Sequence, residues 1–227
     1  MATKIRDGYL SPQVWVSKRE VKVIEVLGRL LPARVEYAEN IFAGEKYSEN
    51  GKTHKEYSLL TLVLSDGKGE QRKVVRFNFS PDNFFALRRE CEPSINYKKS
   101  YEKQLIKKNC LNGEMKIRTV TIKFEYYQKD SRGQIKTDRN GNQIVSKYPW
   151  FIGITEETGK ADSTGNKIEG SRNKVQSFIN MSSDEFQSMI DQTCLYVNVF
   201  AMAFGVPLLR EKMKIVKQKQ EEYKQTR

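Results

Sequence analysis

A repeated pattern of apolar and polar residues divides this chain into two similar halves. Residues 72–87, RKVVRFNFSPDNFFAL, and residues 173–189, NKVQSFINMSSDEFQSM, each contain a Lys-Val pair that leads into an alternating stretch. Because the side chains of a β-strand alternate between its two faces, this pattern predicts a strand in each half. One face of the first strand carries Val75, Phe77 and Phe79, and the same face of the second carries Ser177, Ile179 and Met181.

A helix start follows each of these strands directly. Ser80 precedes Pro81, and proline suits the first position of a helix. Ser182 and Glu185 have the spacing of a capping box. The second helix is apolar through Phe204, so it is buried on more than one side, either in the core or against another subunit. Its candidate oligomerisation residues are Phe186, Ile190, Val197, Phe200 and Phe204.

Further strand-like segments precede each repeat. Before the first repeat these are residues 13–24, 33–42 and 56–65, and before the second they are 116–127, 143–148 and 149–156. Residues 22–31 fit either a strand or a short helix. The Asn140-Gly141 pair favours the positive φ angles of a tight hairpin turn. Residues 158–173 are rich in Gly, Ser and Asp, which predicts a loop.

These elements predict an α+β fold in one domain. It consists of two pseudo-repeats, each of about four antiparallel strands followed by a helix, with the helices packed across the sheets. The expected boundaries are a first unit at 12–92, a basic and partly helical linker at 93–114, a second unit at 115–209 and a charged tail at 210–227.

Charge and composition point to a polyanionic partner. The chain has 227 residues, and 40 Lys and Arg against 28 Asp and Glu give it a net charge of +12. An excess of this size is typical of proteins that bind nucleic acid. Its apolar runs are shorter than the ~20 residues of a membrane-spanning helix, and MATKIRDGYL is not a signal peptide. We therefore expect a cytoplasmic protein, in a bacterial cell or a virus-infected host cell, that binds no membrane.

The residue inventory argues against catalysis. His54 is the only histidine, and the cysteines (Cys91, Cys110 and Cys194) are far apart and odd in number. This composition lacks the clustered ligands of a zinc site and the histidine of an acyl-transfer triad. Residues 153–161 resemble a phosphate-binding loop, but with five residues between the glycines and alanine at the Mg²⁺-binding position. We expect a protein that is not an enzyme and needs neither cofactor nor metal.

The doubled unit in a basic chain of this size resembles the Whirly family of single-stranded DNA-binding proteins. The resemblance rests on VVRFNFSPDNFFAL, SFINMSSDEFQSMI and the apolar helix through Phe204. The plan is similar also to that of single-domain transcriptional coactivators and mitochondrial guide-RNA-binding proteins. It implies two sheets packed with helices across them and a homotetramer held by the helices. It also implies single strands lying across the sheet edges, bound with little sequence preference.

Interleaved rings and cations on the predicted strands suggest the binding surface. Aromatic side chains on a sheet can stack on unpaired bases, and Lys or Arg beside them neutralises phosphates. In the 116–127 strand, Lys123 and Tyr127 share one face, opposite Val120, Ile122 and Phe124. Trp15 and Trp150 also fit core positions. The candidate nucleic-acid-binding residues are Trp15, Lys18, Arg19, Arg76, Asn78, Arg118, Lys123, Tyr127, Lys147, Tyr148 and Trp150.

The sequence therefore predicts a single-stranded DNA-binding protein with little sequence specificity, acting in replication, recombination or transcription. An RNA-binding protein of the same fold is one alternative, because the pattern does not distinguish DNA from RNA. A basic oligomeric structural or assembly protein is another. In each case we expect a homo-oligomer, with a tetramer favoured.

Overall fold

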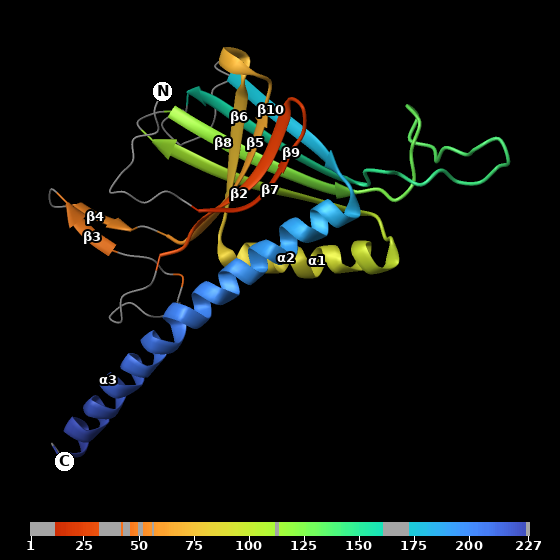
Figure 1. Cartoon of the computed structure of the whole chain (residues 1–227). Helices are drawn as coiled ribbons and strands as arrows, with labels where there is room; N and C mark the ends of the chain where they lie inside the picture. The colour runs from red at the N-terminus through yellow and green to blue at the C-terminus, as the bar shows by residue number, and fades with distance from the viewer. Residues whose placement is uncertain are drawn as a thin grey trace.

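Two antiparallel sheets of four strands, each followed by a helix, make up the computed structural model (Figure 1). The structure describes residues 12–31, 42, 46–49, 52–55, 57–111, 114–160 and 173–225. The first sheet has the order β1 (Gln13–Lys18), β2 (Lys22–Arg29), β5 (Leu59–Asp66) and β6 (Lys73–Phe79). A separate hairpin, β3 (Lys46–Glu49) and β4 (Lys52–Lys55), is inserted between β2 and β5.

The second sheet repeats the plan of the first. Helix α1 (Pro81–Tyr97) follows β6 and leads into β7 (Tyr101–Leu111), β8 (Glu114–Phe124), β9 (Trp150–Lys160) and β10 (Asn173–Met181). Helix α2 (Ser183–Phe200) then continues through a π-helical turn (Ala201–Gly205) into α3 (Val206–Gln225). The predicted α+β class is thus confirmed, with two antiparallel four-stranded sheets.

Both helix starts have the caps that the sequence predicts. The Ser80 hydroxyl accepts a hydrogen bond from the Asn83 amide (3.2 Å), and Pro81 takes the first helical position. The Ser182 hydroxyl accepts from the Glu185 amide (3.2 Å), and the Glu185 carboxylate accepts from the Ser182 amide (2.9 Å). This reciprocal pair satisfies two amides that a helix start leaves without partners.

The core lies between the two sheets and the helices. Strand β6 packs against β8, β9 and β10, and it buries Val75, Phe77 and Phe79 as predicted. The rings of Trp150 and Phe186 join the second sheet to α2, with centroids 3.6 Å apart and planes within 3°. Helix α2 also approaches β2 closely, because the ring of Tyr196 lies where a Cβ of Gly28 would be.

Three sequence-based boundaries need correction. Of residues 22–31, left open as strand or helix, Lys22–Arg29 form strand β2. The single strand expected at 13–24 is divided between β1 and β2 by a turn. The predicted linker at 93–114 contains the end of α1 and strand β7. Strand β7 is at the edge of its sheet, where lysine-rich sequences are common, and its polar composition concealed the alternation.

Two other predicted elements fall partly outside the described residues. Of the strand expected at 33–42, only Phe42 is described. The loop expected at 158–173 begins later than predicted, because β9 continues to Lys160, and residues 161–172 lie outside the described part.

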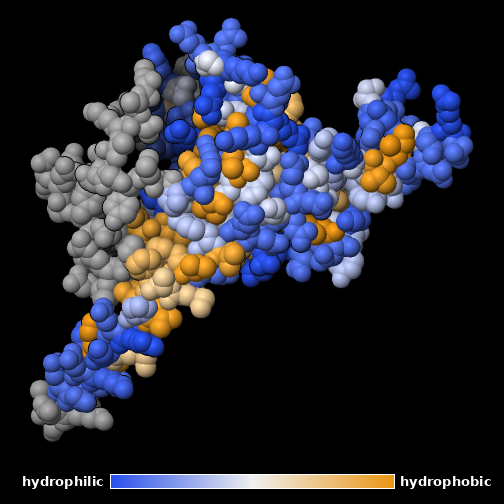
Figure 2. All heavy atoms as spheres, viewed as in Figure 1, coloured by the Kyte–Doolittle hydropathy of each residue, from blue (hydrophilic) through white to orange (hydrophobic). Residues whose placement is uncertain are grey.

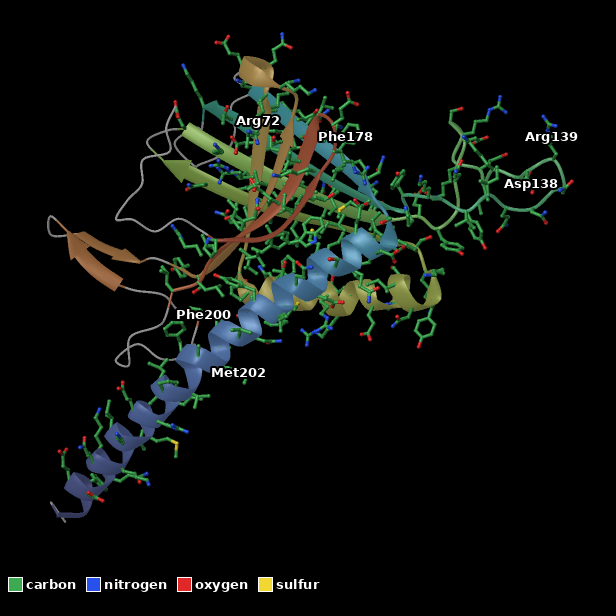
Figure 3. All side chains as sticks on the ribbon, in the orientation of Figure 1. Arg72, Asp138, Arg139, Phe178, Phe200 and Met202 are labelled. Carbon is green, nitrogen blue, oxygen red and sulfur yellow. The ribbon has the colours of Figure 1, made fainter. Side chains whose placement is uncertain are left out.

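A projecting arm, residues 125–149, replaces the strand expected at 143–148 (Figure 1). It contains isolated β-bridges rather than a ladder, such as Thr137 with Gln143. A hairpin turn is present at the predicted Asn140-Gly141 pair, but only Gly141 has a positive φ (+83°) and Asn140 does not. The Asp138 carboxylate accepts hydrogen bonds from the backbone amides of Asn140 (2.8 Å) and Asn142 (2.9 Å). Figure 3 shows Asp138 at the tip of this arm.

The long helix corrects two expectations. Phe186, Ile190 and Val197 are at most 1% exposed and belong to the core of this chain, so they are not available for oligomerisation. Ser183–Tyr223 is long and apolar enough to cross a membrane by length and composition alone, a test that core helices of soluble proteins also pass. The expectation that every apolar run is short was therefore wrong.

Neighbouring valines on β6 provide a test of the sheet packing. Val75 is 1% exposed and Val74 is 41% exposed. We expect Val75→Ala to lower the free energy of unfolding by about 2 kcal/mol, through lost burial and a residual cavity. Val74→Ala is the matched control and should stay within about 0.5 kcal/mol of wild type. Urea titration measures both, and equal losses would contradict the assignment of the two faces.

Candidate nucleic-acid interface

The outer face of the second sheet carries two phenylalanine rings side by side. Phe151 of β9 and Phe178 of β10 point away from the core, because Ile152 and Ile179 beside them are buried. The two rings are stacked, with centroids 5.7 Å apart and planes 25° from parallel. Phe178 is 47% exposed and lies in the half of β10 that leads into α2; Figure 3 labels it on this strand.

A glycine leaves room for the ring of Phe151. Gly153 lies two residues along β9, on the same face, and a Cβ at this position would be 2.9 Å from an atom of the Phe151 ring. The ring therefore occupies the space that a side chain at position 153 would need. Register pairs Gly153 with Phe178 on one side and with Thr121 of β8 on the other. The result is an open aromatic surface bordered by a threonine.

A lysine from the first sheet reaches this aromatic surface. The Nζ atom of Lys22, the first residue of β2, lies 4.0 Å from the centre of the Phe178 ring. It donates a hydrogen bond to the Phe178 carbonyl (2.9 Å) and pairs with Asp66 (3.4 Å). An ammonium group over an aromatic face is attracted by the ring quadrupole. Lys22 therefore places a positive charge at the edge of the rings.

A second ring lies between two cations nearby. Tyr148, at the base of the arm, is 42% exposed. The guanidinium carbon of Arg19 lies 4.8 Å from its ring centre, and the Nζ atom of Lys147 lies 5.4 Å from it. A hollow of about 290 Å³ separates the β1–β2 turn from the end of β10, and Arg19, Lys22, Tyr148 and Phe178 all line it. These four residues define the Tyr148–Phe178 hollow.

Glu185 holds Arg19 beside this hollow. Its carboxylate pairs with the Arg19 guanidinium (2.9 Å), accepts from the Ser17 hydroxyl (3.1 Å) and caps α2 at the Ser182 amide. Burial alone disfavours the charged carboxylate, but the Ser182 amide, the Arg19 charge and the Ser17 hydroxyl outweigh it and lower the pKa of Glu185. The carboxylate is therefore ionised at neutral pH, which fixes Arg19 at the rim of the hollow.

The structure brings three of the sequence-predicted binding residues together and buries two others. Arg19, Lys147 and Tyr148 form the cluster at the hollow. Trp15 and Trp150 are 8% and 0% exposed, so the prediction that they face unpaired bases was wrong. Both are core residues because their large apolar surfaces fill the space between the sheets and α2.

The remaining predicted residues of the second sheet lie apart from the hollow. Lys123 is on the outer face of β8, where it pairs with Glu102 (2.9 Å). Arg118 is on the opposite side of β8, beyond the core, and pairs with Glu156 (2.7 Å). Tyr127 does not share the face of Lys123 as predicted, because β8 ends at Phe124 and Tyr127 belongs to the arm.

Three predicted residues belong to the first sheet and face away from its core. Lys18 and Arg76 are exposed, at the end of β1 and within β6. Asn78 accepts a hydrogen bond from the Thr61 hydroxyl (2.9 Å), so its side chain bridges two strands. Lys18 and Arg76 contribute to the basic character of the surface, and none of the three residues lines the hollow.

Sequence analysis missed Phe151, Phe178 and Lys22. The signal was present for the two phenylalanines, since Phe151 alternates with Ile152 and Phe178 with Ile179 in predicted strands. Assigning the isoleucines to the core places the phenylalanines outside. Lys22 gave no such signal, because its position depends on how the two sheets pack.

The described residues offer little for catalysis. Among them, no group of three or more His, Cys, Asp or Glu side chains could hold a metal ion. Burial raises the pKa of the Cys91 thiol to about 12, so at neutral pH it is protonated and a poor nucleophile.

Comparison with known proteins gives no family. The sequence matches no family model. Among curated proteins, none shows significant sequence similarity to it.

The ionised Glu185 gives a prediction for stability against pH. Its folded-state pKa is below its ordinary value of 4.5, so its stabilising contribution is present at neutral pH and lost as pH falls through the folded pKa. We expect the free energy of unfolding of wild type to exceed that of Glu185→Gln at pH 7. We expect this difference to become smaller as pH falls from about 5 to about 3. Urea unfolding at constant ionic strength measures it, and a constant gap would contradict the proposed role.

Proposed function

We propose that this protein binds single-stranded nucleic acid, DNA by preference, at the Tyr148–Phe178 hollow and the adjoining Phe151 ring. The observation that carries the proposal is the exposed Phe151–Phe178 stack with Lys22 beside it. Unpaired bases present flat faces that stack on such rings at about 1–3 kcal/mol per base. In a duplex these faces are already stacked on each other, so the surface favours single strands.

Positive charge at the rim complements this stacking. Arg19, Lys22 and Lys147 each lie within 6 Å of an exposed ring and can neutralise phosphates on either side of a stacked base. Rings accept any base, and a lysine or arginine paired with phosphate carries no sequence information. Binding with little sequence specificity follows from both features.

The cellular role we propose is in replication, recombination or transcription, where unpaired strands are exposed. We place the protein in the cytoplasm of a bacterial cell or virus-infected host cell, as a binding protein rather than an enzyme. The finer proposal for the fold is a Whirly-like arrangement, supported by the two successive units of four strands and a helix. RNA of the same length is the alternative ligand, and competition between oligo-dT and oligo-U measures the preference.

Replacement of the exposed ring tests the stacking. We expect Phe178→Ala to weaken binding of fluorescent oligo-dT by about 1–3 kcal/mol, roughly five- to 150-fold, in an anisotropy titration. Tyr97→Ala removes a 73% exposed ring at the end of α1 and is the matched control. Equal affinity of Phe178→Ala and wild type for oligo-dT would contradict binding at this interface. Equal affinity of wild type for duplex would argue against a single-stranded ligand.

Salt dependence tests the cations separately. We expect Arg19→Gln to weaken binding and to lower the slope of log affinity against log salt concentration by about one. Arg29→Gln, at the other end of the neighbouring strand β2, is the matched control for charge. A slope unchanged by Arg19→Gln would show that this guanidinium does not contact phosphate.

A further inference from the structure

The long helix exposes an apolar surface where α2 passes into α3. Leu195, Val199, Met202 and Leu209 are 63%, 57%, 72% and 56% exposed, and Val206 between them is 45% exposed. Figure 2 shows hydrophobic side chains gathered along this part of the helix. Their positions alternate in steps of four and three residues, the spacing of a seam between paired helices. Large exposed apolar patches of this kind mark interaction sites.

Charge is distributed unequally along the same helix. Helix α2 carries three acidic residues and no basic one, namely Asp184, Glu185 and Asp191. No charged residue lies between Asp191 and Arg210. Helix α3 carries three glutamates and six basic residues, namely Arg210, Lys212, Lys214, Lys217, Lys219 and Lys224. The order along the helix is therefore acidic, apolar and basic.

We propose that the apolar middle of this helix binds the same segment of a second copy of the chain, in antiparallel orientation. Antiparallel pairing lays Leu195 near Leu209 of the other copy, since both lie seven positions from Met202. It also brings the basic α3 of each copy beside the acidic α2 of the other. Glu185 and Asp191 already pair with Arg19 and Arg88 of their own chain, but both carboxylates remain partly exposed, so the basic α3 of the second copy adds to these contacts. The order of charges is thus complementary to itself, and this favours a second copy over an unrelated partner.

Parallel pairing lacks both advantages. It places the basic ends of the two helices together and the acidic beginnings together, and like charges repel. The beginning of α2 is packed against the body of the protein, whereas α3 extends away from it (Figure 1). Parallel pairing would therefore bring two bodies to the same end of the helix pair. Antiparallel pairing separates them.

The π-helical turn at the centre of the apolar segment permits close approach. Ala203 is small and exposed, so the backbone of a second helix can come near at the crossing, whereas Gly205 is buried within its own chain. Phe200 faces the other way and stacks on Phe42 of its own chain, with ring centroids 6.2 Å apart. Figure 3 shows Phe200 and Met202 on opposite sides of the helix. The exposed side, with Met202, is the one that meets the second copy.

Size measurement tests the association. Sedimentation velocity of the full chain should give at least twice the chain mass of 26.4 kDa. Met202→Glu with Val206→Glu should give a monomer with unchanged thermal unfolding of the body, because both side chains are exposed. Lys217→Glu with Lys219→Glu should raise the dimer dissociation constant at least about tenfold. Lys99→Glu with Lys136→Glu is the charge-matched control and should leave the dimer dissociation constant unchanged.

Disulfide trapping tests the orientation. With Cys110 replaced by serine, Leu195→Cys and Leu209→Cys chains are prepared separately and mixed under mild oxidation. Antiparallel pairing predicts a mixed disulfide between the two chains and little disulfide in either preparation alone. Efficient disulfide formation by each preparation alone indicates parallel pairing and overturns the proposal.

Other occupants of the helix give distinct results. The surface is assigned to a membrane if the chain is a monomer by sedimentation, floats with vesicles that contain anionic phospholipid, and no longer floats with them after Met202→Glu. A monomer that does not float with vesicles contradicts pairing with a second copy. Oligo-dT binding is measured on the same samples, so failure of the pairing and failure of the proposed nucleic-acid binding are separate outcomes.

Discussion

One carboxylate connects the helix, the first sheet and the binding surface. Glu185 completes the cap of α2 through Ser182, and the same side chain holds Ser17 and Arg19 of the other unit. A capping box needs only the first of these contacts. The additional pairing with Arg19 ties the β1–β2 turn to the start of α2. The Tyr148–Phe178 hollow exists because that turn is held against the end of β10.

Local pattern predicted those features of the fold that depend on neighbours in sequence. Alternation identified the inward faces of β6, β8 and β10, and serine spacing identified both caps. It failed for β7, whose lysine-rich sequence reflects its place at a sheet edge. The edge position results from the order of strands, which a pattern of period two does not contain.

The proposed binding residues also divide into those that local pattern could predict and those that it could not. Phe151 and Phe178 could be found from alternation, since both neighbour buried isoleucines. Trp15 and Trp150 were assigned to the binding surface because they are aromatic, not because of the strand face on which they lie. A large ring is as suitable for a core as for a stacking site. Positive charge was a poor guide too. Arg118 and Lys123 are paired with Glu156 and Glu102. Arg19 and Lys22 at the hollow also have carboxylate partners, Glu185 and Asp66, so part of the basic excess serves the fold itself.

The packing of Phe151 over Gly153 has a consequence for affinity. The Phe151 ring already packs beside Phe178 and over Gly153, in the position where a base would stack in the proposed binding mode. A side chain that is already ordered loses little rotational freedom when a base stacks on it, so more of the stacking energy appears as affinity. In the proposed binding mode, preorganisation of this kind favours slow dissociation, because gains in affinity appear mostly in the dissociation rate.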